Sequence, residues 1–189
     1  LLSLALLVAG CATAPEQAPA PADWARHSAA LAALESWSFS GKIALKTANG
    51  ADTAALAWRQ SRDDLEFTLS GPVGIKEATL IREQDQLSLL RNGQLTRLEP
   101  GDDPLYREFG WSLPLDYLPW WLRGLPYPDL PTQRSEINEG HLALLEQAGW
   151  RLEYPDYQWV DGRLLPRVIR FSRQDVSGKI LLKRWTLEP

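Results

Sequence analysis

The spacing of hydrophobic residues changes once near the start of this chain, and the change separates a helix from a sheet. A stripe with gaps of three or four residues follows Asp23 and predicts an amphipathic helix capped by that residue: Trp24, His27, Leu31 and Leu34. From residue 37 onward the apolar positions recur every second residue, which predicts a strand with one buried face. These positions are Trp37, Phe39, Gly41, Ile43 and Leu45.

The two-residue period continues through short strands that are separated by turn signals. Four dipeptides are typical of hairpin turns, because asparagine, aspartate and glycine tolerate positive φ: Asn49-Gly50, Asn92-Gly93, Asp161-Gly162 and Ser177-Gly178. Further strands are predicted near residues 53–60, 65–69, up to 81, 87–89, 134–139, 142–147, 150–154, 168–173 and 180–187. The pattern therefore predicts ten or eleven short antiparallel strands.

Two proline-containing segments interrupt this series of strands. Residues 103–106 read as the start of a short helix, and residues 114–124 read as a compact helix closed by Gly124. A long antiparallel sheet with few helices is an α+β arrangement, and we expect a curved sheet whose concave face the helices close.

The first residues follow a different pattern. An uncharged apolar run over residues 4–10 ends in small residues directly before Cys11, the single cysteine. It is too short to span a bilayer, which needs ~20 residues, and it matches the apolar core of a secretory signal. Val8-Ala9-Gly10-Cys11 resembles a bacterial lipobox, so we expect residues 1–10 to be a partial signal peptide and Cys11 to be lipidated. An ordinary signal peptide with an incidental cysteine is the alternative.

The segment that follows has the composition of a spacer. Residues 11–22 are rich in alanine and proline and contain no aromatic or branched apolar side chain. Proline at this density favours an extended spacer of ~3.1 Å per residue, about 30 Å in all. Residue 12 is alanine rather than aspartate, which by analogy with bacterial sorting favours the outer membrane. Residues 23–189 are then a single globular domain.

Composition and charge narrow the classes of function. The net charge of −4 gives no sign of nucleic-acid binding. No motif for a metal site, a nucleotide site or a catalytic serine is present, so we expect no enzyme, no metal and no cofactor. We expect His27 to pack on its helix and His141 to lie solvated in a turn. Nine tryptophans are many for one domain, and large flat side chains can line an apolar site for acyl chains.

The C-terminal strands carry a basic stretch with two interpretations. Seven cations stand against one acid, Asp175: Arg163, Arg167, Arg170, Arg173, Lys179, Lys183 and Arg184. One interpretation is the solvated outer face of two edge strands, where charge discourages edge pairing. The other is a contact with an acidic carrier protein or with lipid phosphates, which would be sensitive to salt.

Three segments together resemble the outer-membrane lipoprotein receptor family LolB. The first runs from Trp24 through the helical stripe to Trp37 and on to Gly41-Lys42-Ile43-Ala44. The second is Gly71-Pro72-Val73-Gly74, and the third is the Leu-Pro…Trp-Leu-Arg-Gly-Leu-Pro segment of residues 113–126. The lipobox fits as well, because members of this family are themselves lipoproteins.

The resemblance implies an open, unclosed antiparallel β half-barrel of about eleven strands, with helices as a lid over an apolar cavity. It implies a monomer, lipid-anchored on the periplasmic face of the outer membrane, that takes acylated lipoproteins from the periplasmic carrier LolA. Cargo would then enter the inner leaflet of the outer membrane. The loop at Gly71, Pro72, Val73 and Gly74 would help insertion, with Val73 where the family usually has leucine. We expect the cavity to be lined by Phe39, Ile43, Leu45, Phe67, Leu69, Leu118, Trp121 and Leu122.

Two other classes of protein remain open at this point. One is an envelope-assembly lipoprotein that binds protein partners and has no cavity. The other is an esterase that acts on acyl chains, which would need a serine placed beside His27 or His141.

Overall fold

The computed structural model describes residues 23–48, 50–71, 78–109 and 112–188, and these form one sheet with three helices. The helices are α1 (Trp24–Ala32), α2 (Pro104–Phe109) and α3 (Leu118–Leu122). The strands are β1 (Ser36–Thr47), β2 (Gly50–Ser61), β3 (Asp64–Ser70), β4 (Ala78–Glu83), β5 (Gln86–Arg91), β6 (Gln94–Arg97), β7 (Thr132–Asn138), β8 (His141–Gln147), β9 (Trp150–Val160), β10 (Arg163–Arg173) and β11 (Val176–Glu188).

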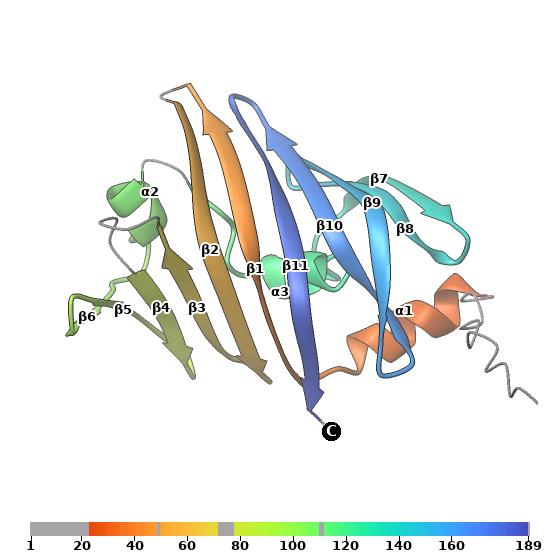
Figure 1. The fold of residues 1–189 in the computed structure, drawn as a ribbon, viewed down its shortest axis with the longest axis horizontal. Helices are drawn as coiled ribbons and strands as arrows, with labels where there is room; N and C mark the ends of the chain where they lie inside the picture. Colours follow the sequence, from red (N-terminus) through yellow and green to blue (C-terminus); the bar gives the residue numbers. More distant parts are fainter. Residues whose placement is uncertain (1–22, 49, 72–77, 110–111, 189) are drawn as a thin grey trace, which may run out of the picture.

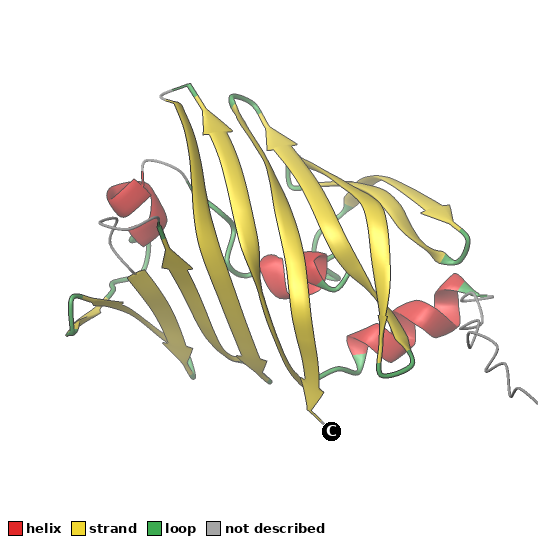
Figure 2. Cartoon of the chain, viewed as in Figure 1, coloured by secondary structure: helices red, strands yellow, loops and turns green. Residues whose placement is uncertain are grey.

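All eleven strands belong to one open antiparallel sheet. Their order is β6-β5-β4-β3-β2-β1-β11-β10-β9-β8-β7, so the first and last strands pair in the middle and β6 and β7 form the two edges. Figure 1 shows this sheet with α3 lying behind β1 and β11. Figure 2 shows how small the helical part is beside the sheet. The open, eleven-stranded antiparallel arrangement predicted from the sequence is confirmed.

Local sequence explains how α1 begins and how two pairs of strands are connected. The Asp23 side chain accepts a hydrogen bond from the Ala25 backbone N–H at 2.9 Å, so Asp23 is the N-cap of α1 as predicted. Asn92 and Gly93 have φ of 51° and 76°, which are the values of a type I′ turn between β5 and β6. Asp161 and Gly162 join β9 to β10 in the same way, with φ of 46° and 74°.

Alternation along the strands places a large aromatic and aliphatic core on the concave face. Along β1, Trp37, Phe39, Ile43 and Leu45 are all at least 96% buried, while the residues between them are more exposed. The indole of Trp37 stacks on that of Trp58 on β2, with ring centroids 6.1 Å apart and planes 8° apart. Most of the unusual tryptophan content is therefore explained by the core.

The structure corrects the positions of two predicted turns. Arg173 pairs with Val176, so β11 begins before Ser177-Gly178 and the prediction of a turn at that dipeptide is wrong. Gly178 serves packing instead, because a Cβ there would lie 2.4 Å from the ring of Phe171 and 2.5 Å from the carbonyl oxygen of Ala44. At the first hairpin, Thr47 pairs with Gly50, so Gly50 belongs to β2 rather than to the turn.

The structure also corrects the interpretation of the basic stretch as part of two edge strands. β10 and β11 lie in the interior of the sheet, because β11 pairs with both β1 and β10 and β10 pairs with β9. The charges therefore do not protect an edge from pairing with another chain. His141 differs from its prediction as well: it opens β8 and is half-buried, with its ring 4.3 Å from the ring of Tyr157.

Candidate functional site

The eight residues predicted to line an acyl-chain site come together in one cluster. Three belong to the short helix α3, and five come from β1 and β3 on the concave face of the sheet. All are between 2% and 6% exposed: Phe39, Ile43, Leu45, Phe67, Leu69, Leu118, Trp121 and Leu122. All eight therefore belong to the buried apolar core, but the side chains that lie directly beneath α3 come from β9, β10 and β11 rather than from the five predicted positions of β1 and β3.

The helix α3 is five residues long, shorter than the predicted segment of residues 114–124. A turn precedes it, in which the Tyr117 N–H donates to the Pro114 carbonyl at 3.0 Å. A Schellman motif ends it: Gly124 has φ of 77°, its N–H donates to the Trp121 carbonyl, and the Leu125 N–H donates to the Trp120 carbonyl. Both ends of α3 are therefore defined by its own sequence.

Little empty space remains beneath α3, so the apolar cavity expected there is almost completely filled by side chains. A cavity of about 10 Å³ lies between the helix and the sheet, at or below the ~10–15 Å³ that a single water requires. It is lined by Leu113, Leu118, Trp121, Leu122, Trp150, Leu152, Ile169, Phe171 and Ile180. An acyl chain can enter only if α3 and the sheet separate, because the interior is already packed.

A buried glutamine attaches α3 to the C-terminal half of the sheet. Gln147, at the end of β8, is fully buried, and its Oε1 accepts hydrogen bonds from Trp121 Nε1 at 3.0 Å and from the Tyr127 N–H at 2.9 Å. Its Nε2 donates to the carbonyls of Tyr127 and Leu130. The hydroxyl of Tyr154 on β9 donates to the Trp121 carbonyl at 3.0 Å. These bonds hold α3 and the segment that follows it against β8 and β9.

A buried arginine attaches α3 to α1. Arg123 is 5% exposed, and its Nη1 donates to the carbonyls of Leu31 and Leu34 at 2.7 and 3.0 Å, while its Nε donates to the Pro119 carbonyl at 2.9 Å. The guanidinium also lies over the rings of Trp37 and Trp120. Burial lowers the pKa of Arg123 to about 10, so the group is still charged at neutral pH. Carbonyl oxygens at the end of α1 thus accept bonds from a cation, as helix C-termini favour.

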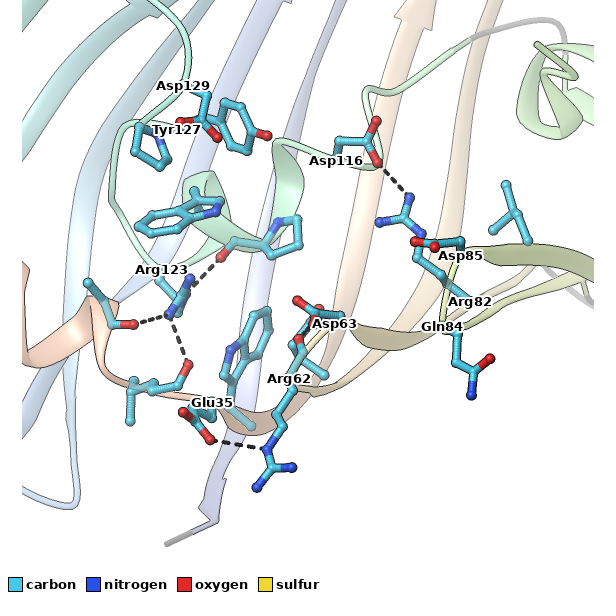
Figure 3. Close-up of a pocket in the computed structure, with 18 residues that line it drawn as sticks. Glu35, Arg62, Asp63, Arg82, Gln84, Asp85, Asp116, Arg123, Tyr127 and Asp129 are labelled. Carbon is cyan, nitrogen blue, oxygen red and sulfur yellow. Dashed lines mark hydrogen bonds and ion pairs between the residues drawn. The ribbon is translucent and has the colours of Figure 1, made fainter. Parts of the chain in front are cut away.

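On its other side, α3 borders a polar groove shown in Figure 3. The groove has a volume of about 820 Å³ and lies toward the N-terminal half of the sheet. Five carboxylates and three guanidinium groups line it: Glu35, Asp63, Asp85, Asp116, Asp129, Arg62, Arg82 and Arg123. Two ion pairs cross this region, Arg82 with Asp116 at 2.6 Å and Arg62 with Glu35 at 3.3 Å.

Neither Arg123 nor Gln147 was predicted as a site residue. Each is a polar residue inside an otherwise apolar segment, Arg123 between Leu122 and Gly124 and Gln147 at the end of the apolar alternation of β8. A polar residue in such a position indicates a buried hydrogen-bonding side chain, although the sequence does not identify its partners. Cys11 and the predicted loop residues Pro72, Val73 and Gly74 lie outside the described residues.

The described residues contain no group of three or more histidine, cysteine, aspartate or glutamate side chains placed to hold a metal ion. Within the same residues, no helix has the length and apolar character needed to cross a membrane.

Comparison with known proteins identifies the family. The model of the family described as "Outer membrane lipoprotein LolB" matches residues 35–185. The chain belongs to the LolB family. The curated outer-membrane lipoprotein LolB of Stutzerimonas stutzeri is 37% identical over 188 residues, covering 96% of this chain and 91% of the relative. That of Pseudomonas fluorescens strain Pf-5 is 34% identical over 192 residues, covering 98% and 93%.

Solved structures support the fold that the LolB family match implies. A LolA superfamily protein from Nitrosomonas europaea superimposes with a TM-score of 0.52 at 8% identity, covering 83% of this chain and 88% of that chain. A DUF1329 family protein from Desulfovibrio piger gives a TM-score of 0.59 at 9% identity, covering 87% and 90%. The chain is thus a LolB-type outer-membrane lipoprotein receptor, its fold is similar to that of the LolA superfamily protein from Nitrosomonas europaea, and the esterase and assembly-factor alternatives are not favoured.

Proposed function

We propose that this protein takes acylated lipoproteins from a periplasmic LolA carrier, holds their acyl chains between α3 and the concave face of the sheet, and releases them into the inner leaflet of the outer membrane. The observation that carries this proposal is that the eight predicted apolar residues, on α3, β1 and β3, all belong to one buried apolar core. Apolar surface of this kind, closed by one small helix, suits chains that must enter and leave.

The direction of transfer follows from differences in buried apolar area. Each buried methylene contributes ~0.8 kcal/mol whichever cavity holds it, so small differences in fit decide between carrier and receptor. Opening α3 exposes its own apolar face, and an incoming chain re-covers that surface. Delivery to the bilayer is downhill, because the chains are more fully covered in lipid than in a partly open site.

The lipid anchor and the insertion loop are further parts of the proposal. Lipidated Cys11 and the extended spacer of residues 12–22 would hold the domain close to the periplasmic face of the outer membrane. Replacing Cys11 with serine should release the protein from membranes without unfolding it, because the spacer carries no core residue. Val73, between Pro72 and Gly74, would guide cargo into lipid.

The decisive experiment is transfer of a lipoprotein from loaded carrier to the Cys11→Ser chain, with binding of a fluorescent acyl probe measured in parallel. Ile43 is 2% exposed on the concave face and Ala44, next to it, is exposed on the convex face. Ile43→Glu should lose both activities, because it places an unpaired charge in the site. Ala44→Glu is the matched control and should retain both.

The wild-type chain decides the proposal even if Ile43→Glu fails to fold. Binding of the acyl probe to the wild type, with displacement by a lipopeptide, is the expected result. A folded wild type that binds no apolar probe and accepts no cargo would contradict the proposal and favour a protein-binding assembly role.

A further inference from the structure

The lysines of this chain are concentrated on one part of its surface. The sequence has five lysines, and four of them lie on the two strands that meet in the middle of the sheet. Lys42 and Lys46 belong to β1, Lys179 and Lys183 belong to β11, and all four side chains are exposed. Strands far apart in the sequence therefore bring these cations together.

The pairing register places these lysines on the same face of the sheet. Lys179 is opposite Ala44 of β1 and Arg170 of β10, and Lys183 is opposite Ser40 of β1. Since the residues that alternate with them are buried in the concave core, the lysines point to the convex side, away from α3. We call this surface the basic face and define it by Lys42, Lys46, Arg170, Lys179, Lys183 and Arg184.

The basic face lacks the ion pairs that several arginines form on other parts of the surface. Arg59, for example, binds Glu66, and Arg167 binds Asp156. In the part of the chain that the structure describes, none of the six cations of the basic face forms an ion pair. Glu153, opposite Arg170, is bound by Arg151 at 3.0 Å. A chain of net charge −4 thus presents an uncompensated positive surface.

The chemistry of the basic face fits phospholipid headgroups better than a protein partner. Protein interfaces usually have an apolar, aromatic-rich centre. Among the residues that the structure describes, the exposed large hydrophobic side chains lie outside the basic face: Leu95, Tyr106, Ile137 and Trp159. Small residues such as Ser40 and Ala44 separate the lysines, and Leu181 between them is half-buried. Flexible ammonium groups suit a fluid layer of phosphates, which requires no fixed bidentate geometry.

We infer that the basic face docks the protein on anionic phospholipid headgroups of the membrane to which it is anchored. This inference rests on the proposed outer-membrane function. A lipid tether of about 30 Å keeps the domain near the bilayer, so a weak electrostatic contact is enough to orient it. Docking by the convex side leaves the concave side, with α3 and the polar groove, free to meet a carrier.

Vesicle co-sedimentation of the Cys11→Ser chain tests the inference without cargo and without an acyl anchor. The chain should bind vesicles of phosphatidylcholine with about one third phosphatidylglycerol, and it should not bind vesicles of phosphatidylcholine alone. Binding should weaken as salt is raised to ~0.15 M and above, since exposed charges are then screened.

Charge-removal variants locate the contact. Each lysine near an anionic surface contributes about a fivefold change in partition, so Lys→Gln at positions 42, 46, 179 and 183 together should lower binding several hundredfold. The matched control removes four exposed cations from other elements, with Gln at Arg26, Arg97, Arg107 and Arg134, and should keep most of the binding. Circular dichroism verifies that both variants are folded.

The outcomes separate this inference from the proposed function. Equal loss in both quadruple variants would mean a general effect of net charge and would overturn the basic face as a site. A lysine variant that binds vesicles normally but fails to accept cargo from the carrier would show docking to a protein instead. Acyl-probe binding tests the proposed function separately, because that assay contains no vesicle.

Discussion

The two halves of the sheet contact α3 in different ways. Toward the C-terminal strands the helix is held by buried hydrogen bonds, through Gln147 on β8 and Tyr154 on β9. Toward the N-terminal strands it borders the polar groove, where Asp116 just before α3 forms an ion pair with Arg82 of β4. Asp116 is 68% exposed in that pair, whereas Gln147 is fully buried.

This difference indicates which side of α3 would separate first in the opening that the proposed function requires. Buried hydrogen bonds are costly to break, because each separated group loses its partner without gaining water. An exposed ion pair separates more easily, because both charges regain water. We therefore expect α3 to stay attached to the C-terminal strands and α1 while the space toward the N-terminal strands widens.

The largest effect is expected from breaking the attachment at Gln147. Gln147→Leu leaves Trp121 Nε1 and the backbone groups of Tyr127 and Leu130 without partners in the interior. We expect a loss of about 3–5 kcal/mol in the free energy of unfolding, measured by urea denaturation. Gln133→Leu on the exposed strand β7 is the control, with a change within ~0.5 kcal/mol. Equal stability of the two variants would contradict the view that Gln147 holds α3 against the C-terminal strands.

The second largest effect is expected from substitutions at Val73, in the connection between β3 and β4 of the N-terminal half. Val73→Glu should fold normally yet reduce delivery of lipoprotein into vesicles at least tenfold, because a charge at the proposed insertion point would oppose entry into hydrocarbon. Val73→Leu is the control and should deliver at least as well as the wild type. Unfolding curves confirm that both variants are folded. Wild-type delivery by Val73→Glu would reduce this loop to an ordinary turn.

The sequence predicted the sheet well and the attachment of α3 poorly, for a physical reason. Alternation in a strand records which side is buried, so the inward positions of β1 and β3 could be assigned residue by residue. Arg123 bonds Leu31, which is 92 positions away, and no local pattern records that partner. Gly178 misled the prediction because glycine signals a turn and a close contact equally well, and here Phe171 requires the contact.

A smaller effect is expected from the ion pair between Asp116 and Arg82, which lies between α3 and the N-terminal strands. Asp116→Asn removes the charge that binds Arg82, and surface ion pairs of this kind contribute ~0.2–1 kcal/mol. Stability should therefore change little, while acyl-probe uptake measured by stopped flow should become up to about fivefold faster. Glu136→Gln, which breaks the exposed pair with Arg134 on β7, should leave uptake unchanged. Faster uptake in both variants would mean that the effect is not specific to the side of α3 that faces the N-terminal strands.

The smallest effect is a pH dependence of stability that arises from His27 of α1, the helix to which Arg123 attaches α3. Burial, and then the charge of His141, lower the pKa of His27 in the folded protein. Below pH ~6.5 the unfolded chain therefore binds a proton at this residue more readily than the folded chain does, so His27 makes stability fall as the pH decreases from 7 to 5. The urea midpoint of the wild type should fall more steeply over this range than that of His27→Gln. His141→Gln should retain part of the slope, since burial of His27 persists. A wild type that gains stability relative to His27→Gln on acidification would contradict the assignment.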